Sequence, residues 1–390
     1  MKKLGLLITG VAVIAISLLP KGTAKAATAI TNCTELQAMS SNLAETYTLA
    51  NDIDCSATTG WNSGDGFEQV GNNATKFTGT LDGQNYKINN LFINRPGTNN
   101  IGLFGWTTNA SISNLYLNNV SIRGNVYTGG LIGGADGAIQ INNVHVSGAV
   151  TGGIGTGGLV GALYAFDEPD ISNIFKASNT AVVTGTNYVG GLVGDTGPGD
   201  ASVLLISQSF NSGNITSSGV AAGGIIGYSQ YGDDNTTLLN SYNSGNVTAT
   251  SDKGGLFGVA YLTDVSKSYS SGLVAGTDAA TNGALIGLFD VSNDMFNSFW
   301  NTETSGQSGP CGTAVPCPEK ATGLSTAQMR TQSTFTEATW DFENVWGICE
   351  SFNNGFPYLL WQNPTCTTPS DTPGLPNTGF GNQLYPIPFI

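Results

Sequence analysis

A five-residue phrase of glycine and apolar residues recurs seven times along the middle of this chain. The copies occupy 101–105, 129–133, 157–161, 190–194, 223–227, 254–258 and 283–287, and GGLVG is their commonest form. Successive copies begin 28 to 33 residues apart. A period of this length indicates that one supersecondary unit is repeated along the chain.

Composition restricts that unit to β structure. Glycine supplies 54 of the 390 residues, and only 10% of the residues are charged. Glycine weakens helices, whereas the frequent Val, Thr, Ser and Asn favour strands and turns. We therefore expect short strands joined by turns. Because an array of units grows in one dimension, the whole chain can form one long domain with distinct ends.

A second motif precedes most copies of the glycine phrase. Its clearest copies are SFNSGNI at 209–215, SYNSGNV at 241–247 and SYSSGLV at 268–274. The aromatic residues Phe210, Tyr242 and Tyr269 then share one column, in which we also place Leu117, His145 and Phe175. Each unit is expected to contain a strand, a Ser/Asn/Gly turn, a second strand, a loop, and the glycine phrase as a third strand.

Three short strands cannot bury a face alone, but they can when each unit coils into one turn and stacks on the next at about 4.8 Å. The predicted fold is therefore all-β, a parallel β-helix. Its apolar ladder consists of Leu103, Leu131, Leu159, Leu192, Ile225, Leu256 and Leu285. The glycines beside each ladder residue allow tight corners that a Cβ would obstruct.

The first 26 residues have the pattern of a secretory signal. Lys2 and Lys3 precede an apolar run at 4–19, and small residues surround an expected cleavage site between Ala26 and Ala27. A membrane anchor is the weaker interpretation, since the run is shorter than the roughly 20 residues that span a bilayer. The protein is expected to be exported. Its net charge of −14 makes nucleic acid a poor partner.

Six cysteines fall into three pairs that are close in sequence. We predict the disulfides Cys33–Cys55, Cys311–Cys317 and Cys349–Cys366, since such bonds persist outside the cytoplasm and the ends of an array have an unpaired face. Structural zinc is the weaker alternative, because no C-x-x-C occurs.

These features divide the chain into five parts. They are a signal peptide at 1–26, an N-terminal cap at 27–76, the repeat array at 77–300, a C-terminal cap at 301–363 and a Thr/Pro linker with a tail at 364–390. The C-terminal cap contains a helix that starts with a capping box at Ser325 to Gln328, and it is expected to cover the last open turn.

The repeated GGLVG phrase with its SYNSGNV companion, the opening DIDC and FTGTLDG segments and the closing NGFPYLLW segment resemble the bacterial GLUG-repeat surface proteins. The resemblance covers about 30–361. It implies a secreted or surface-attached, adhesin-like protein with GLUG-type repeats. The same repeat accompanies immunoglobulin-cleaving zinc peptidases, so the resemblance implies a location but no single activity.

The residues provide few candidates for catalysis. H-E-x-x-H is absent and His145 is the only histidine, so we predict neither a zincin site nor a Ser-His-Asp site and assign His145 a packing or turn role. Acidic residues gather in three loops, at Asp167, Glu168 and Asp170, at Asp195 and Asp200, and at Asp233 and Asp234. We interpret them as solvated carboxylates, with weak Ca²⁺ binding as the next alternative and sugar hydrolysis as the last.

The tail contains the sequence Leu375-Pro376-Asn377-Thr378-Gly379, which resembles the L-P-x-T-G sorting motif. The resemblance implies that a sortase joins Thr378 to the cell wall. The residues at 380–390 depart from the full signal, because they supply neither an apolar span nor a basic tail.

Taken together, the sequence predicts a non-catalytic β-helix at the cell surface, an adhesin or binding module without a cofactor. Its expected partner is a host or neighbouring-cell surface, a matrix protein or a glycan, and its attachment would involve a sortase and the cell wall. The alternatives are a carbohydrate-active β-helix enzyme, a polysaccharide lyase or glycoside hydrolase, and an inert stalk. The chain is predicted not to be an enzyme.

Overall fold

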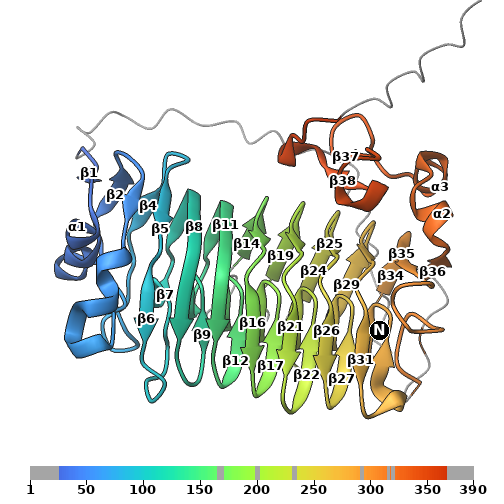
Figure 1. Cartoon of the computed structure of the whole chain (residues 1–390), viewed down its shortest axis with the longest axis horizontal. Coiled ribbons are helices and arrows are strands. Elements are labelled where there is room, and N and C mark those ends of the chain that lie inside the picture. Colours follow the sequence, from blue (N-terminus) through green and yellow to red (C-terminus); the bar gives the residue numbers. More distant parts are fainter. Residues whose placement is uncertain are drawn as a thin grey trace, which may run out of the picture.

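The computed structural model describes residues 26–164, 171–197, 203–230, 235–289, 294–313, 317 and 321–366. These residues form short parallel strands that stack, turn upon turn, along the long axis of the molecule (Figure 1). The predicted all-β parallel solenoid is confirmed. Three parallel sheets of 23, seven and six strands make its sides.

The large sheet contains three neighbouring columns of strands. The first column is β1 (Thr28–Ile30), β2 (Thr46–Leu49), β4 (Thr80–Asp82), β8 (Ser111–Arg123), β11 (Gln140–Thr151), β14 (Ile171–Phe175), β19 (Val203–Ser207), β24 (Asn235–Leu239), β29 (Thr263–Ser266) and β34 (Asp294–Phe296). The long strands β8 and β11 continue through the other two columns.

The second column also contains β3 (Ile53–Asp54), β5 (Lys87–Asn89), β15 (Ser178–Asn179), β20 (Phe210–Asn211), β25 (Tyr242–Asn243), β30 (Tyr269–Ser270), β35 (Ser298–Asn301) and β36 (Ala321–Leu324). The third column adds β6 (Phe92–Asn94), β16 (Val182–Gly185), β21 (Ile215–Ser217), β26 (Val247–Ala249) and β31 (Val274–Gly276).

The two smaller sheets lie on either side of the glycine phrase. The six-stranded sheet contains β9 (Thr128–Gly129), β12 (Ile154–Gly157), β17 (Asn187–Gly190), β22 (Val220–Gly223), β27 (Ser251–Gly254) and β32 (Asn282–Gly283). The seven-stranded sheet contains β7 (Phe104–Thr108), β10 (Ile132–Asp136), β13 (Val160–Tyr164), β18 (Val193–Thr196), β23 (Ile226–Ser229), β28 (Phe257–Ala260) and β33 (Ile286–Phe289).

The glycine phrase is therefore a corner between two strands, where the sequence predicted one strand. In the copy at 190–194, Gly190 ends β17 and Val193 begins β18. A Cβ on Gly190 would lie 1.8 Å from the carbonyl oxygen of Val193, and one on Gly191 would lie 2.0 Å from that of Gly224 in the next turn. Only glycine fits this corner, because the backbone itself occupies the space a side chain would need.

The predicted apolar ladder is present inside the corner. All seven of its members are fully buried. From Leu131 to Leu256, each backbone amide donates to the carbonyl of the ladder residue in the following turn, as from Leu159 to Leu192 (N···O 3.0 Å) and from Leu192 to Ile225 (2.9 Å). The ladder belongs to a core that continues through all the described turns.

The SYNSGNV motif forms an inner polar ladder and an outer aromatic column. The inner Asn179, Asn211 and Asn243 are joined by amide hydrogen bonds of 2.8 Å from Nδ2 to Oδ1. The rings of Phe210 and Tyr242 stack in parallel at 5.0 Å on the other side of the strands, as do those of Tyr242 and Tyr269. Buried amides are tolerated here because every turn supplies the partner of the next.

The register of the column corrects two sequence-based assignments. Its members are Tyr116, His145, Ser178, Phe210, Tyr242, Tyr269 and Phe299. Leu117 and Phe175 were placed in this column but lie outside it. Leu117 is one residue beyond Tyr116 and therefore faces the opposite side of the strand, whereas Phe175 ends β14 in the first column, where it pairs with Ser207. Leu117 is accordingly buried in the core.

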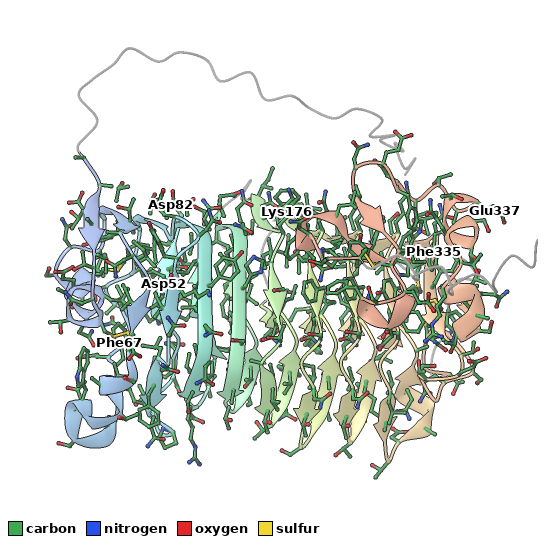
Figure 2. The ribbon with its side chains drawn as sticks, turned by 45° about the horizontal axis from the view of Figure 1, so that its top comes forward. Asp52, Phe67, Asp82, Lys176, Phe335 and Glu337 are labelled. Atoms are coloured by element: carbon green, nitrogen blue, oxygen red, sulfur yellow. A yellow bond between two sulfur atoms is a disulfide. The ribbon has the colours of Figure 1, made fainter. Side chains whose placement is uncertain are left out.

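The ends of the solenoid carry the short helices and the disulfides. At the N-terminal end, α1 (Cys33–Ala38) and the 3-10 helices η1 (Met39–Ser41) and η2 (Ser56–Gly64) surround the first strands. The three cysteine pairs are bonded as predicted, with Cys33–Cys55 at this end. Phe67 lies at the N-terminal end, whereas Phe335 lies at the opposite end (Figure 2). The stack of parallel strands already begins with β1, within the predicted N-terminal cap.

The C-terminal segment departs from the expected cap. The strand β36 extends the stack, and α2 (Thr326–Met329) begins with the predicted capping box, followed by α3 (Gln332–Thr336). The residues from 340 to 362, which we call the strap, then run back along the side of earlier turns (Figure 1). The strap contains the antiparallel pair β37 (Trp346–Gly347) and β38 (Tyr358–Leu359) and the 3-10 helices η4 (Asn353–Gly355) and η5 (Leu360–Gln362). A last 3-10 helix, η3 (Ala279–Thr281), lies in the array.

The strap covers the outer aromatic column. The indole of Trp361 donates to the carbonyl of Gln208 (2.8 Å), and that of Trp340 donates to the carbonyl of Asn297 (2.9 Å). Trp346 packs against both Tyr242 and Tyr269. These contacts join residues 43 to 153 positions apart, so the strap ties at least four turns together.

His145 marks the end of the column that the strap reaches. Its ring lies 4.6 Å from that of Tyr116 and 5.1 Å from that of Trp361, and its nitrogens contact Ser178 Oγ (2.8 Å) and Asn143 Oδ1 (3.0 Å). Burial lowers the pKa of His145 to about 4. These contacts agree with the packing role expected from the sequence.

The ladder can be tested with an aspartate in place of a core leucine. Leu192→Asp should lower the free energy of unfolding by more than about 3 kcal/mol, because it buries a charge without a partner. Val182→Asp is the matched control, since Val182 lies in the same turn but is 48% exposed. Urea unfolding followed by circular dichroism measures both. Equal stability of the two variants would show that the inward face is assigned wrongly.

The strap should make stability depend on pH through His145. The pKa of this histidine is below its unfolded value of about 6.5, so stability is complete above pH 6.5 and falls as the pH decreases toward 4. The expected loss is roughly 2–3 kcal/mol. His145→Phe, which copies Phe210, should remove this part of the pH dependence in urea titrations at pH 7 and pH 4.5. An unchanged profile would argue against burial of the neutral ring.

Candidate functional site

One aromatic ring occurs in each of six consecutive turns, along the corner between the two smaller sheets; the first, Trp106, is buried and the other five are partly exposed. We call these residues the aromatic stripe: Trp106, Tyr127, Tyr164, Tyr188, Tyr228 and Tyr261. At about 4.8 Å a turn, the stripe extends over roughly 25 Å. Partly exposed aromatic rings with polar tips are typical of binding surfaces.

Glycines of the following turn allow three of these rings to lie flat. A Cβ on Gly134 would lie 2.5 Å from the ring of Trp106, one on Gly155 would lie 2.7 Å from that of Tyr127, and one on Gly197 would lie 1.9 Å from that of Tyr164. The order is the same each time, since a ring from one turn covers a glycine of the next. The strand register therefore fixes where the rings point.

Two stripe residues also have an unusual backbone conformation. Tyr127 and Tyr188 have φ values of 58° and 57°, whereas the corresponding corner of another turn contains Gly155 with a φ of 67°. Ala221 and Asp252 occupy the same corner in later turns with φ values of 59° and 54°, so the fold imposes this conformation, which strains a bulky residue. Stability alone would favour glycine at these two positions.

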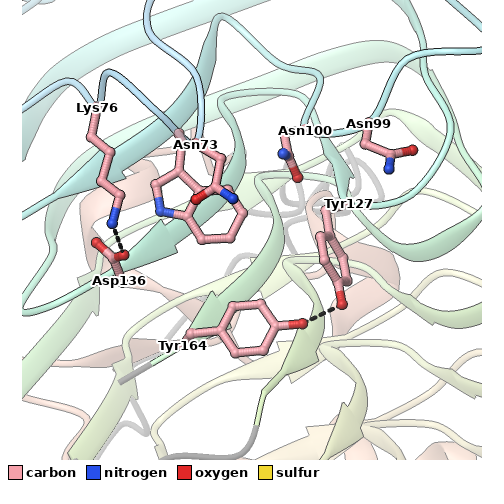
Figure 3. Close-up of a pocket in the computed structure, with 8 residues that line it drawn as sticks. Asn73, Lys76, Asn99, Asn100, Tyr127, Asp136 and Tyr164 are labelled. Carbon is pink, nitrogen blue, oxygen red and sulfur yellow. Dashed lines mark hydrogen bonds and ion pairs between the residues drawn. The ribbon is translucent and has the colours of Figure 1, made fainter. Parts of the chain in front are cut away.

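The N-terminal half of the stripe lines a cavity of about 470 Å³ (Figure 3). Its wall consists of Asn73, Lys76, Asn99, Asn100, Trp106, Tyr127, Asp136 and Tyr164. The ammonium group of Lys76 pairs with the carboxylate of Asp136, and the hydroxyl of Tyr164 donates to that of Tyr127. The Trp106 and Tyr164 rings are nearly parallel, with centroids 6.1 Å apart.

Three buried polar atoms of this wall have no hydrogen-bond partner within the part of the chain that the structure describes. They are Nε1 of Trp106, Oδ1 of Asn100 and Oδ1 of Asp136. Native proteins pair nearly all their buried polar atoms, because each unpaired one costs about 1–3 kcal/mol. Three such atoms in one cavity indicate a site shaped for a polar ligand.

The C-terminal half of the stripe surrounds a buried carboxylate. The rings of Tyr188 and Tyr228 lie 4.4 Å apart, and Tyr261 is 6.1 Å from Tyr228. Asp195 is 2% exposed and accepts hydrogen bonds from Nε2 of Gln230 (3.1 and 3.3 Å). Burial raises the pKa of Asp195 to about 6, although the Gln230 hydrogen bonds act in the opposite direction. The pKa of Tyr228 rises to about 12, mainly because it is buried.

The structure places only some of the site residues expected from the sequence. Asp195 lies beside the stripe, in register with Tyr228. Its expected neighbour Asp200 lies outside the described residues, as do Asp167, Glu168, Asp170, Asp233 and Asp234. The sorting-like residues Leu375 to Gly379 are also outside them. Ala26 and Ala27 are exposed at the start of the described chain, and cleavage between them stays a prediction.

Sequence analysis missed the stripe, although a signal for it was present. Tyr127 and Tyr188 each stand two residues before a glycine phrase, while Trp106 and Tyr228 directly follow one. Each of these positions has an aromatic residue in only some of the turns, so no single position of the unit has one throughout. Only the coiling of the chain aligns them.

Among the described residues, no group of three or more His, Cys, Asp or Glu side chains is arranged to hold a metal ion. Over the same ranges, the structure contains no helix of sufficient length and apolarity to cross a membrane. Calcium binding by the acidic loops stays a prediction.

Comparison with known proteins connects the chain to a family of peptidases. Residues 18–148 match the family model of the M26 IgA1-specific metallo-endopeptidase N-terminal region. The solenoid is similar to the crystal structure of a protein from Bacteroides ovatus described as an immunoglobulin A1 protease. The TM-score is 0.53 at 17% identity, and the match covers 86% of this chain and 92% of that one. At this identity the likeness shows the fold.

Two curated relatives match shorter stretches. A protein of Evansella cellulosilytica described as a Gly-rich membrane protein is 38% identical over 119 residues, which is 29% of this chain and 13% of the relative. Halomucin of Haloquadratum walsbyi is 46% identical over 89 residues, which is 22% of this chain and 1% of the relative. The chain thus spans a small fraction of either protein's length.

The prediction that the chain is not an enzyme is wrong, because the family model that matches residues 18–148 is one of metallo-endopeptidases. The prediction rested on the absence of H-E-x-x-H and of a second histidine. The absence of such a motif concerns only the residues that would carry out catalysis. The matching family model describes a different part, the N-terminal region of a peptidase.

The buried carboxylate of the stripe can be tested through the pH dependence of stability. The pKa of Asp195 is higher when folded than its unfolded value of about 4. The contribution of the Asp195 carboxyl to the free energy of unfolding is therefore complete below pH 4 and is lost as the pH rises through 6. Asp195→Asn should be more stable than wild type by roughly 2 kcal/mol at pH 7 and equally stable below pH 4. Lower stability of the variant at pH 7 would contradict this assignment.

Proposed function

We propose that this chain is the binding region of an exported protein of the IgA1-protease type and that its aromatic stripe holds a glycoprotein of the host. The observation that carries the proposal is the stripe itself, with one aromatic ring in each of six successive turns, five of them partly exposed. The family match at residues 18–148 supports the peptidase relationship and, with it, immunoglobulin A1 as the ligand.

The character of the stripe supports a binding role over an inert stalk. A stalk needs only polar side chains outside, whereas this corner keeps two tyrosines at positive φ and a buried carboxylate with a raised pKa. Strained backbone and perturbed carboxylates gather where a protein binds or reacts. Repetition in successive turns also gives a long ligand many weak contacts, whose effects add.

The proposed location outside the cytoplasm follows from the same relationship and from the sequence motifs near the two ends of the chain. Export would begin with cleavage between Ala26 and Ala27, and Thr378 would be the residue that a sortase joins to the cell wall. The disulfides at both ends of the solenoid support an environment outside the cytoplasm. The GLUG-type repeat and the sorting motif are part of this proposal.

Binding can be measured by surface plasmon resonance with immobilised immunoglobulin A1 and the full chain. Wild type should bind, and Tyr188→Ala and Tyr228→Ala should each weaken binding by about tenfold, because each removes a ring from the centre of the contact. Tyr86→Ala is the matched control, as Tyr86 is an exposed tyrosine outside the stripe. Equal weakening by all three variants, or no binding, would contradict the proposal.

The same samples test for peptidase activity. The chain is incubated with immunoglobulin A1 in the presence of Zn²⁺ and, separately, with a chelator, and the products are separated by electrophoresis. Cleavage that the chelator abolishes would assign metallopeptidase activity to these residues. Binding without cleavage would assign them the recruitment of the substrate.

A further inference from the structure

We propose that the cavity between Lys76, Asn100, Trp106 and Asp136 is a binding site for one neutral sugar ring. The inference rests on the proposed function, since it names the part of a glycoprotein that the N-terminal half of the stripe would hold. It nevertheless depends on the polar atoms of this cavity and not on the rings of Tyr188 and Tyr228, and sugar binding tests it separately.

The unpaired atoms of the cavity define the hydrogen bonds that a ligand must supply. Asn100 Oδ1 and Asp136 Oδ1 are acceptors, while Trp106 Nε1 is a donor. A ligand must therefore donate at two points and accept at a third. Hydroxyl groups do both, so neighbouring hydroxyls on one ring can satisfy all three atoms without leaving a charge unpaired.

The aromatic wall supplies the second requirement for a sugar. A pyranose ring has an apolar face of C–H groups and a polar edge, and it binds where an aromatic face lies beside hydrogen-bonding groups. Trp106 and Tyr164 provide nearly parallel faces, inclined by 10°. The ring of Trp106 is held in place because it covers Gly134. The volume of about 470 Å³ lies in the range of small-molecule sites.

The charges in the wall favour a neutral sugar over an acidic one. The ammonium group of Lys76 is the cation of the wall, and it already pairs with Asp136. An added carboxylate would compete with Asp136 for Lys76 and would face the unpaired Oδ1 of that residue. Like charges in a partly buried site repel strongly. A sialic acid or uronic acid is therefore expected to be rejected.

The inference is tested by saturation-transfer difference NMR with the full chain. The probes are methyl galactoside, methyl mannoside and methyl N-acetylglucosaminide as neutral sugars, with N-acetylneuraminic acid and methyl glucuronide as acidic ones. At least one neutral probe should bind, with saturation strongest on the C–H face of its ring. The acidic probes should bind at least tenfold more weakly than that neutral probe.

Two substitutions locate the site. Trp106→Phe keeps an aromatic face but removes the Nε1 donor, and Gly134→Ala places a methyl group against the Trp106 ring. Each should weaken binding of the neutral probe by about tenfold or more. Tyr86→Phe, at an exposed tyrosine outside the stripe, is the matched control and should leave the affinity unchanged. Thermal melts by circular dichroism verify that each variant is folded, and Trp106→Phe decides the outcome if Gly134→Ala does not fold.

The possible outcomes separate this inference from the proposed function. Absence of neutral-sugar binding while immunoglobulin A1 still binds would overturn the sugar site and leave the proposed function intact. Sugar binding that is unaffected by Trp106→Phe, or acidic probes that bind as well as neutral ones, would also overturn it. Sugar binding lost in Trp106→Phe without any binding of immunoglobulin A1 would support the site and contradict the proposed partner.

Discussion

The close approach of successive turns at the glycine corners is the constraint on which the rest of this structure depends. Each turn can hydrogen bond to the next over its whole length only if the chain reverses direction without side chains in the way. Gly190 and Gly191 show the requirement, since a Cβ on either would collide with a backbone carbonyl. The buried leucine of each corner then contributes the apolar contact that holds the stack together.

Because successive turns stack in register, one residue from each turn contributes to a continuous row on the surface. On one side this stacking makes the column from Tyr116 to Phe299, which the strap covers from His145 onward with three tryptophans. On the corner between the smaller sheets it makes the aromatic stripe. The first feature stabilises the molecule, because its rings are buried, whereas the second leaves rings partly exposed and polar atoms unpaired. The same geometric rule thus supplies both a structural and a binding element.

The difference between these two features explains how far the site could be predicted. The outer column was visible in the sequence because Phe210, Tyr242 and Tyr269 stand in the same motif, one in each repeat. The stripe was not, because its members occupy different positions of the unit and meet only where β17 turns into β18 and its equivalents. The resemblance noted in the sequence already extended to immunoglobulin-cleaving peptidases. The prediction that the chain is not an enzyme nevertheless considered only catalytic residues within the chain, whereas the family match concerns an N-terminal region.

The sequence by itself determined the repeat, the parallel solenoid, the buried ladder and the pairing of the cysteines, because each of these depends on residues at fixed or short separations. Only the tertiary structure decided which side chains of different turns become neighbours. It placed Lys253 in the inner column of Val189 and Ala222, where its ammonium group donates to two backbone carbonyls, and it brought Trp361 to His145. It also laid Trp106 over Gly134 to form the cavity. Such contacts depend on loop lengths and on the path of the strap, which vary from turn to turn and have no period that a sequence pattern could reveal.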